Sequence, residues 1–209
     1  MFNIWDFWAD KYDRLWVQKY SLKPTRDHIV IVLSDYKNKF KNNEELKVLD
    51  LGCGPGELIR DLGREFVNID VTGIDFSEKM IEISKKRNPR AKHLIMDVSD
   101  LNILDENYDI IISTHSIPYY KEPKEVFKNL YRLLKDDGRI LAAFASGNGI
   151  YDKFILSFVK LTTGRAKYPS DKEFRSIIAP FFKVENLEII RKKFFMPRIA
   201  VYTLKKVES

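Results

Sequence analysis

Cysteine is almost absent from this chain of 209 residues. Its single residue, Cys53, excludes an intramolecular disulfide, and this fits the reducing cytoplasm. No cysteine and histidine cluster has the spacing of metal ligands, so we expect no metal. Long apolar runs are missing as well, and none approaches the ~20 residues that a membrane span needs. The first ten residues lack the cationic and apolar blocks of a secretion signal. These absences predict a cytoplasmic protein without a membrane span.

Acidic residues are outnumbered, which gives a net charge of +6 and a pI of about 9.2. Such a balance is compatible with a nucleic-acid partner. The basic residues are spread along the chain, however, and the densest clusters, at 191–193 and 205–206, flank expected strands. We therefore favour a lysine-rich solvated surface, without excluding nucleic acid. The oligomeric state is left open.

A third absence concerns the turn in residues 48–56, Val-Leu-Asp-Leu-Gly-Cys-Gly-Pro-Gly. A dinucleotide-binding turn has the spacing G-x-G-x-x-G, but the position that should be the last glycine holds Glu57 or, counted from Gly54, Ile59. The lysine and hydroxyl residue of a phosphate-binding P-loop are also missing. An apolar strand, a glycine turn and a helix still predict a site where a polar ligand approaches the backbone.

Strands and helices alternate from residue 47 onward, which predicts a parallel sheet covered by helices. Helices are expected at 78–87 with Ser77 as cap, from Pro123 to a stop at Asp137-Gly138, around 151–164, and after a capping box that joins Ser170 to Glu173. The expected strands are 47–51, 69–74, 93–96, 108–114, 139–144, 182–190 and 194–204.

The N-terminal 46 residues differ in composition, because aromatic side chains crowd their first part and a helical period follows Pro24. We interpret residues 1–46 as a helical, aromatic-rich segment that could close over the site as a lid, although plain core packing explains the aromatics equally well. Tyr12 and Trp16, spaced i and i+4, are the residues that we expect to face an acceptor pocket.

Two further acids follow the next two strands. Asp75 ends the strand at 69–74, and Asp97 ends the strand at 93–96. Parallel strand ends share one edge of an open α/β sheet, where ligands bind. A carboxylate at Asp75 can accept hydrogen bonds from both ribose hydroxyls. A carboxylate at Asp97 can accept one from the exocyclic amine of adenine, with the Val98 N–H available to a ring nitrogen. These positions together predict an adenosine-containing ligand.

These residues resemble the class I S-adenosylmethionine-dependent methyltransferases. The resemblance rests on four segments in the family's order, 48–56, 72–77, 96–98 and 134–141. A shorter segment, Trp8 to Asp13, is similar to the start of quinone-biosynthesis methyltransferases that act on small molecules. The resemblance implies an α/β, Rossmann-like, doubly wound sheet of seven strands, mostly parallel with the last strand antiparallel, and helices on both faces. Residues 47–209 would form the methyltransferase domain, and together with the N-terminal segment they would make one compact domain.

The resemblance also implies the cofactor, S-adenosyl-L-methionine, which leaves as S-adenosyl-L-homocysteine. Asp50 and the 52–56 backbone would hold the methionyl part, Asp75 the ribose, and Asp97 the adenine. The residues expected to bind the cofactor are Asp50, Gly52, Cys53, Gly54, Gly56, Asp75, Phe76, Asp97, Val98 and Thr114. Cys53 is interpreted as a small residue in a tight turn, not as a reactive thiol.

The acceptor is harder to predict than the cofactor. Residues 113–120 lack the Asn/Asp-Pro-Pro-Tyr/Phe motif of enzymes that methylate base amines, so we expect a small-molecule acceptor. His115 is the candidate general base, with packing against the cofactor as the alternative. Tyr119 and Tyr120 would line the acceptor pocket or belong to the core. The other hypotheses are an RNA or protein methyltransferase and a non-catalytic S-adenosylmethionine-binding module; the glycine spacing disfavours an NAD-dependent oxidoreductase.

Overall fold

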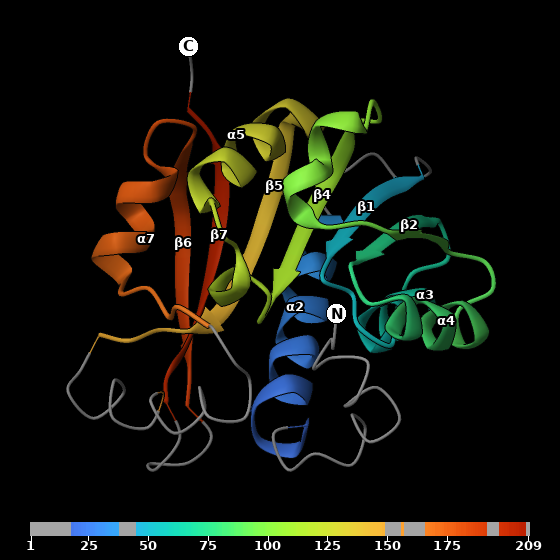
Figure 1. The fold of residues 1–209 in the computed structure, drawn as a ribbon. Helices are drawn as coiled ribbons and strands as arrows, with labels where there is room; N and C mark the ends of the chain where they lie inside the picture. The colour runs from blue at the N-terminus through green and yellow to red at the C-terminus, as the bar shows by residue number, and fades with distance from the viewer. Residues whose placement is uncertain (1–17, 38–44, 149–155, 157–165, 192–196, 208–209) are drawn as a thin grey trace.

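The computed structural model describes residues 18–37, 45–148, 156, 166–191 and 197–207. These residues build one seven-stranded sheet in the order β3-β2-β1-β4-β5-β7-β6 (Figure 1). In this order β1 to β3 lie on one side of β4 and β5 to β7 on the other. The chain therefore adds strands first toward one edge of the sheet and then toward the other, and the change falls between β1 and β4. Ligands of open α/β sheets bind at such a reversal, beyond the carboxyl ends of the strands.

The strand directions confirm the expected arrangement. Neighbouring strands from β3 to β5 pair in parallel, whereas β7 runs antiparallel to both β5 and β6. The last strand is therefore the one reversed strand of the seven in the described residues. Their bounds are β1 Leu46–Leu51, β2 Ile69–Asp75, β3 Lys92–Ile95, β4 Tyr108–Thr114, β5 Leu134–Ala145, β6 Phe182–Ile190 and β7 Ile199–Lys206.

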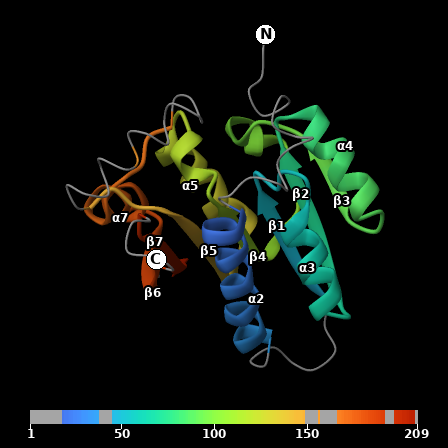
Figure 2. The ribbon, with the colours of Figure 1, turned by 90° about the horizontal axis from the view of Figure 1, so that it is seen from below.

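Helices cover both faces of the sheet, because the central strands are apolar on both sides. Along β4, Ile110 and Ile112 face one buried cluster while Ile111 faces the other. Helices α2, α3 and α4 pack on the first cluster, and α5 and α7 on the second (Figures 1 and 2). The helical elements are η2 Gln18–Leu22, α2 Lys23–Lys37, α3 Glu57–Glu65, α4 Glu78–Arg87, η3 Val98–Ile103, η4 Ile117–Tyr119, α5 Pro123–Leu133 and α7 Asp171–Ile178.

Two predicted helix starts are confirmed by their caps. The Ser77 hydroxyl accepts a hydrogen bond from the Met80 N–H at the start of α4. Ser170 and Glu173 form the reciprocal capping box that opens α7. Each cap satisfies backbone N–H groups that have no partner inside the helix.

The end of α5 is a correction. The sequence placed the end of this helix at Asp137-Gly138, but the helix ends at Leu133. Leu134 is already the first residue of β5, where it pairs with Tyr108 of β4. Leu134 is buried in either conformation, so an apolar pattern cannot tell the last helical residue from the first strand residue. A shift in the pairing between Tyr108 and Ile110 absorbs the extra residues.

The N-terminal segment is described from residue 18. Ile29 and Leu33 of α2 are fully buried in the same cluster as α3 and β1, so this helix belongs to the core. The expected helix around 151–164 lies outside the described residues, except for the helical, buried Leu156. Among the described helices, none is long and apolar enough to cross a membrane.

Candidate functional site

The glycine turn joins β1 to α3 at the carboxyl end of the sheet. Gly52, Gly54 and Gly56 all have a positive φ, of 70°, 53° and 75°. The N–H groups of Gly52 and Cys53 both donate to the Ile74 carbonyl, and that of Gly54 donates to Asp75. The turn is therefore tied to β2 through these N–H groups, and the approach of a polar ligand to its backbone stays a prediction.

The glycines are required for two different reasons. A Cβ on Gly56 would lie 2.1 Å from the Ser84 hydroxyl oxygen, and one on Gly52 would lie 2.7 Å from Ser116 Cβ. A Cβ on Gly54 would meet no atom of the described chain within 4 Å. Internal packing therefore excludes side chains at Gly52 and Gly56, whereas Gly54 leaves bare backbone beside open space.

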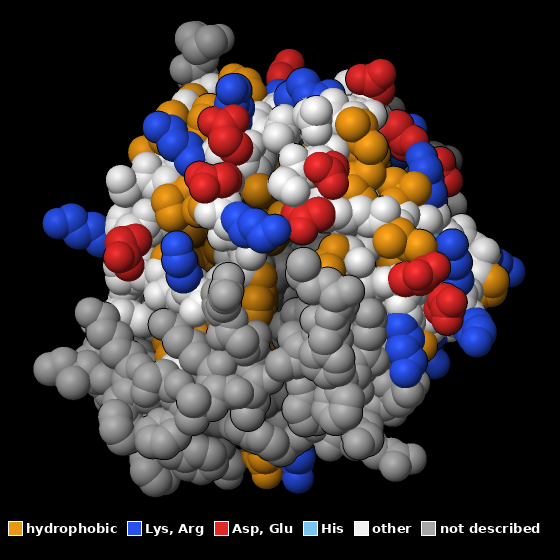
Figure 3. Space-filling view, in the orientation of Figure 1, with side chains coloured by type: hydrophobic (Ala, Val, Ile, Leu, Met, Phe, Trp, Pro, Cys, Tyr) orange, Lys and Arg blue, Asp and Glu red, His pale blue; other side chains and the backbone are white. Residues whose placement is uncertain are grey.

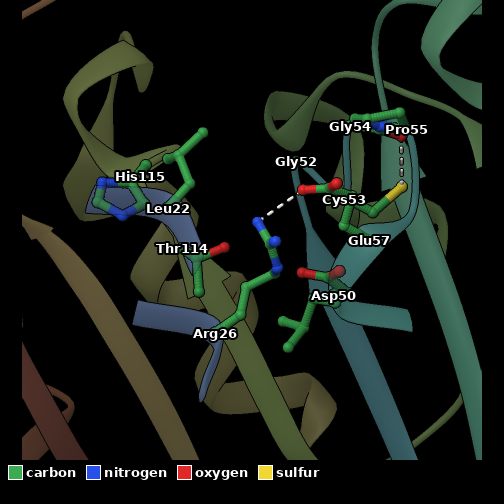
Figure 4. Close-up of a pocket in the computed structure, with 11 residues that line it drawn as sticks. Leu22, Arg26, Asp50, Gly52, Cys53, Gly54, Pro55, Glu57, Thr114 and His115 are labelled. Carbon is green, nitrogen blue, oxygen red and sulfur yellow. Dashed lines mark hydrogen bonds and ion pairs between the residues drawn. The ribbon is translucent and has the colours of Figure 1, made fainter. Parts of the chain in front are cut away.

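That open space is a pocket between the glycine turn, the end of β4 and helix α2 (Figure 4). The turn lies on one side, Thr114 and His115 lie on the other, and Arg26 extends between them. The residues that line it are Leu22, Arg26, Asp50, Gly52, Cys53, Gly54, Pro55, Glu57, Leu58, Thr114 and His115. Six of the predicted site residues thus share one pocket: Asp50, Gly52, Cys53, Gly54, Thr114 and His115.

Asp50 is the most unusual group in this pocket. It sits near the end of β1 with 1% of its surface exposed, and both carboxylate oxygens are buried with no hydrogen-bond partner among the described residues. Burial, with a smaller contribution from Asp75, raises the pKa of Asp50 to about 7. A buried carboxylate without a partner is costly, and a cationic ligand group would satisfy it.

Asp75 is the last residue of β2 and Asp97 follows β3, as predicted, but both already accept hydrogen bonds. Asp75 accepts from the N–H groups of Gly54 and Ser77, so it braces the glycine turn. Asp97 accepts from the N–H and hydroxyl of Ser99 and caps η3. Neither acid lines the pocket that contains Asp50.

The other two residues predicted around the adenosine lie near these acids in the chain. Phe76 is 47% exposed, although it is a large apolar side chain, and Val98 is half-buried. An exposed phenylalanine that follows a strand at the binding edge of the sheet offers an aromatic face to a ligand. The ribose and adenine roles of these residues stay predictions.

Arg26 is the main site residue that sequence reasoning missed. It comes from α2, is buried, and forms ion pairs with Glu57 at 2.6 Å and with Asp61 at 3.2 Å. The missed signal is its position. Leu22, Arg26, Ile29 and Leu33 follow the i, i+4, i+7, i+11 spacing of one helix face, so a cation stands in an apolar stripe.

His115 follows β4 in a left-handed conformation, with φ at 60°. A positive φ is uncommon outside glycine and points to a constrained site. Burial, followed by the positive charge of Arg26, lowers the pKa of His115 to about 4, so the imidazole is neutral near pH 7. A base this weak is poorly matched to general-base catalysis near neutrality, and the base role stays a prediction.

Tyr119 and Tyr120, predicted to line an acceptor pocket, lie apart from the residues of the pocket described above. The Tyr120 hydroxyl hydrogen-bonds with those of Ser113 and Ser116, and burial raises its pKa to about 12. Its ring belongs to the core cluster, which was the alternative interpretation. Tyr12 and Trp16 lie outside the described residues.

Acidic, cationic, hydroxyl and apolar side chains line the pocket together with the backbone of the glycine turn. The Cys53 thiol is buried, and burial raises its pKa, which disfavours the reactive thiolate. Within the described part of the chain, no group of three or more acidic, histidine or cysteine side chains could hold a metal ion.

The fold and the glycine turn together define a class I methyltransferase-type domain. Comparison with known families agrees, because residues 49–142 match the model of the family described as "Methyltransferase domain". This match covers slightly less than half of the chain, so the segment is similar to the methyltransferase domains of that family.

Individual relatives cover the same region. The chain is 33% identical over 112 residues to a malonyl-[acyl-carrier protein] O-methyltransferase of Bacillus anthracis, a match that covers 53% of this chain and 41% of the relative. It is 33% identical over 95 residues to a demethylmenaquinone methyltransferase of Thermotoga maritima, covering 46% and 42%. The chain thus spans less than half the length of each of these relatives.

Solved structures share the fold along the whole chain. The magnesium protoporphyrin IX methyltransferase of Synechocystis PCC 6803, solved with bound SAH, superposes with a TM-score of 0.75 at 21% identity, covering 97% of this chain and 98% of that one. At this identity the likeness concerns the fold alone.

Proposed function

We propose that this protein transfers a methyl group from S-adenosylmethionine to a small-molecule acceptor. The observation that carries the proposal is Asp50, a buried carboxylate without a partner in the described chain, which lines a pocket beside the bare backbone of Gly54. The ligand that such a pocket needs is cationic where it meets Asp50. The amino-acid end of S-adenosylmethionine carries an ammonium group, so the residues present fit this cofactor.

The remaining groups suit the other parts of the same ligand. Arg26, held between Glu57 and Asp61, offers a guanidinium to the ligand's carboxylate. In this proposal Asp75 accepts from the ribose and Asp97 from the adenine, and Phe76 and Val98 follow them directly in the chain. When bound, the cofactor supplies an activated methyl group on a sulfonium, so the protein's own task is to align the reactants and exclude water.

The small-molecule acceptor is supported by the relatives' names, two of which refer to a malonyl thioester carrier and a quinone precursor. The charge distribution points the same way. Among the described residues on the face shown in Figure 3, Lys and Arg side chains are interspersed with Asp and Glu and form no continuous basic patch of the kind that binds nucleic acid. We further propose a cytoplasmic location, supported by the single, reduced cysteine.

We also propose that residues 47–209 hold the cofactor while the N-terminal 46 residues cover the pocket. Helix α2 supports this division, because Leu22 and Arg26 line the pocket from the N-terminal side. A cover that excludes water would favour transfer to the intended acceptor.

Titration calorimetry with S-adenosylmethionine, S-adenosylhomocysteine and NAD tests the cofactor. We expect both sulfur compounds to bind and NAD to give no heat. A ligand at 100 times its Kd should also stabilise the fold by about 2.7 kcal/mol. If the folded protein binds neither sulfur compound, the proposal is wrong.

Gly54→Ala gives a sharper test of the pocket. The new methyl group would enter the open space beside the turn, so we expect S-adenosylhomocysteine binding to weaken at least tenfold. Gly63→Ala controls for a methyl group added in open space, since that glycine lies within α3 and its Cβ would also meet nothing within 4 Å. Because, of these two glycines, only Gly54 has a positive φ, the unfolding free energy of Gly54→Ala is measured beside its affinity, which separates backbone strain from a filled pocket. The control should bind normally and gain up to ~1 kcal/mol of stability.

The acceptor is identified by following label from methyl-labelled S-adenosylmethionine into a metabolite extract, RNA or protein. We expect labelled small molecules. Label in RNA or protein would overturn the acceptor class, and binding without any turnover would indicate a non-catalytic module.

A further inference from the structure

A hydrogen bond joins the N-terminal helix to the end of β4. Thr25 of α2 is fully buried, and its hydroxyl lies 3.1 Å from Nε2 of His115. The same hydroxyl donates to the Ser21 carbonyl at 2.8 Å. A hydroxyl has one proton to donate, so the Thr25 oxygen can only accept from His115. The proton of the neutral imidazole therefore lies on Nε2.

The backbone and charge around His115 hold the ring in this state. The His115 N–H donates to the Ala143 carbonyl at 2.7 Å, which fixes the residue in its left-handed conformation. Burial and the nearby Arg26 guanidinium disfavour a second proton on the ring. With Nε2 used as a donor, Nδ1 keeps the ring's lone pair, and no described group hydrogen-bonds to it.

We propose that Thr25 is a positioning residue that fixes His115 in the Nε2–H tautomer, so that Nδ1 is left to accept a hydrogen bond from an O–H or N–H group of the methyl acceptor. This inference rests on the proposed function, because it assigns the polarity of the acceptor site next to the cofactor pocket. It predicts that the acceptor presents a hydrogen-bond donor to the enzyme. The neutral imidazole of His115 orients that donor by hydrogen bonding, and Thr25 acts only through His115.

The tautomer itself can be measured without any acceptor. The chain has three histidines, His28, His93 and His115, so imidazole nitrogen signals in ¹⁵N-labelled protein are assigned by replacing His28 and His93 one at a time. We expect His115 to show the Nε2–H tautomer in the wild type and in Thr25→Ser, and a tautomer mixture in Thr25→Val. An Nδ1–H tautomer in the wild type, or no change in Thr25→Val, would overturn the inference.

The functional arm uses the labelled-methyl assay on the small-molecule fraction. Thr25→Val should lower turnover about tenfold while S-adenosylhomocysteine affinity stays within twofold, and Thr25→Ser should restore turnover. Thr203→Val is the matched control, because Thr203 is a buried threonine of β7 remote from the pocket. A loss as large in this control would show a general packing effect and contradict the positioning role.

The two arms separate this inference from the proposed function. If S-adenosylhomocysteine does not bind the wild type, the proposed function fails and the inference fails with it. If it binds and methyl transfer occurs, but Thr25→Val has wild-type turnover, the inference alone is wrong.

Discussion

A single buried carboxylate determines much of the chemistry of the site. Asp50 has no partner among the described residues because β1 carries it into the edge of the core, while the N–H groups of Gly52, Cys53, Gly54 and Gly56 are directed at β2 or at the turn itself. Its raised pKa means that the folded protein retains a proton near pH 6 that the unfolded chain has lost. The site is thus less stable alone than it would be with a cation bound.

Replacing Asp50 by Asn should therefore make stability less dependent on pH. The folded pKa of about 7 lies above the ordinary 3.8, so the wild type loses stability as pH rises from 4 to 7. We expect Asp50→Asn to match the wild type near pH 4 and to exceed it by about 4 kcal/mol at pH 8, as an upper estimate. Urea unfolding at both pH values measures this.

The same variant carries its own check on function. Asn cannot balance an ammonium group, so S-adenosylhomocysteine binding should weaken although the fold is more stable. A variant that is destabilised at pH 8, or that binds as tightly as the wild type, would show that Asp50 has a partner in solution.

Among the elements, α2 contributes most that was not expected. It supplies Arg26 and Thr25 to the site from a segment outside the matched family region. Its apolar face packs on the sheet, and the ion pairs of Arg26 attach it to α3. An element that both packs and lines the pocket links cofactor binding to the placement of the N-terminal segment.

Arg26→Met tests this attachment. Removing Arg26 leaves the mostly buried Glu57 without its closest counter-charge, at 2.6 Å, and leaves Asp61 with Arg60, so we expect a loss of about 3 kcal/mol in the free energy of unfolding. The matched control on the same helix is Lys23→Met, which removes the exposed pair with Asp27 and should cost less than about 1 kcal/mol. Denaturant unfolding compares the two, and equal costs would contradict a buried role for Arg26.

At the scale of the whole molecule, two apolar clusters enclose one sheet, and both reach the strands next to the glycine turn. Aromatic packing strengthens one of them, where Phe174 lies 4.8 Å from Phe144 and 4.6 Å from Tyr202 between ring centroids. Because α2 shares the other cluster, we expect the N-terminal helix and the sheet to unfold together.

Leu33→Ala checks that expectation. Leu33 is fully buried between α2 and the sheet, so its truncation should cost 2–5 kcal/mol and shift one single transition in circular dichroism. Ile31→Ala, at a position 59% exposed on the same helix, should have little effect. If the main transition keeps its midpoint in Leu33→Ala, then α2 is not part of the cooperative unit.

The sheet was largely predictable because its signals are local. The central strands β1 and β4 are apolar runs, and the caps at Ser77 and Ser170 are short-range hydrogen bonds between residues three apart. The end of α5 was not predictable, because Leu134 is buried whether it is helical or extended, and only its pairing with Tyr108 decides the matter.

The sequence by itself determined the order of most elements, since periodicity and turn chemistry act within a few residues. The one reversed strand followed only from the resemblance to a known family. Only the tertiary structure decided which polar groups of the site have partners. The N–H groups of the glycine turn donate to β2 or within the turn, and the Asp50 carboxylate has no partner among the described residues. Tyr120 packs in the core, and α2 contributes Arg26 and Thr25 to the site. Those outcomes depend on contacts between residues far apart in the chain, which no local pattern records.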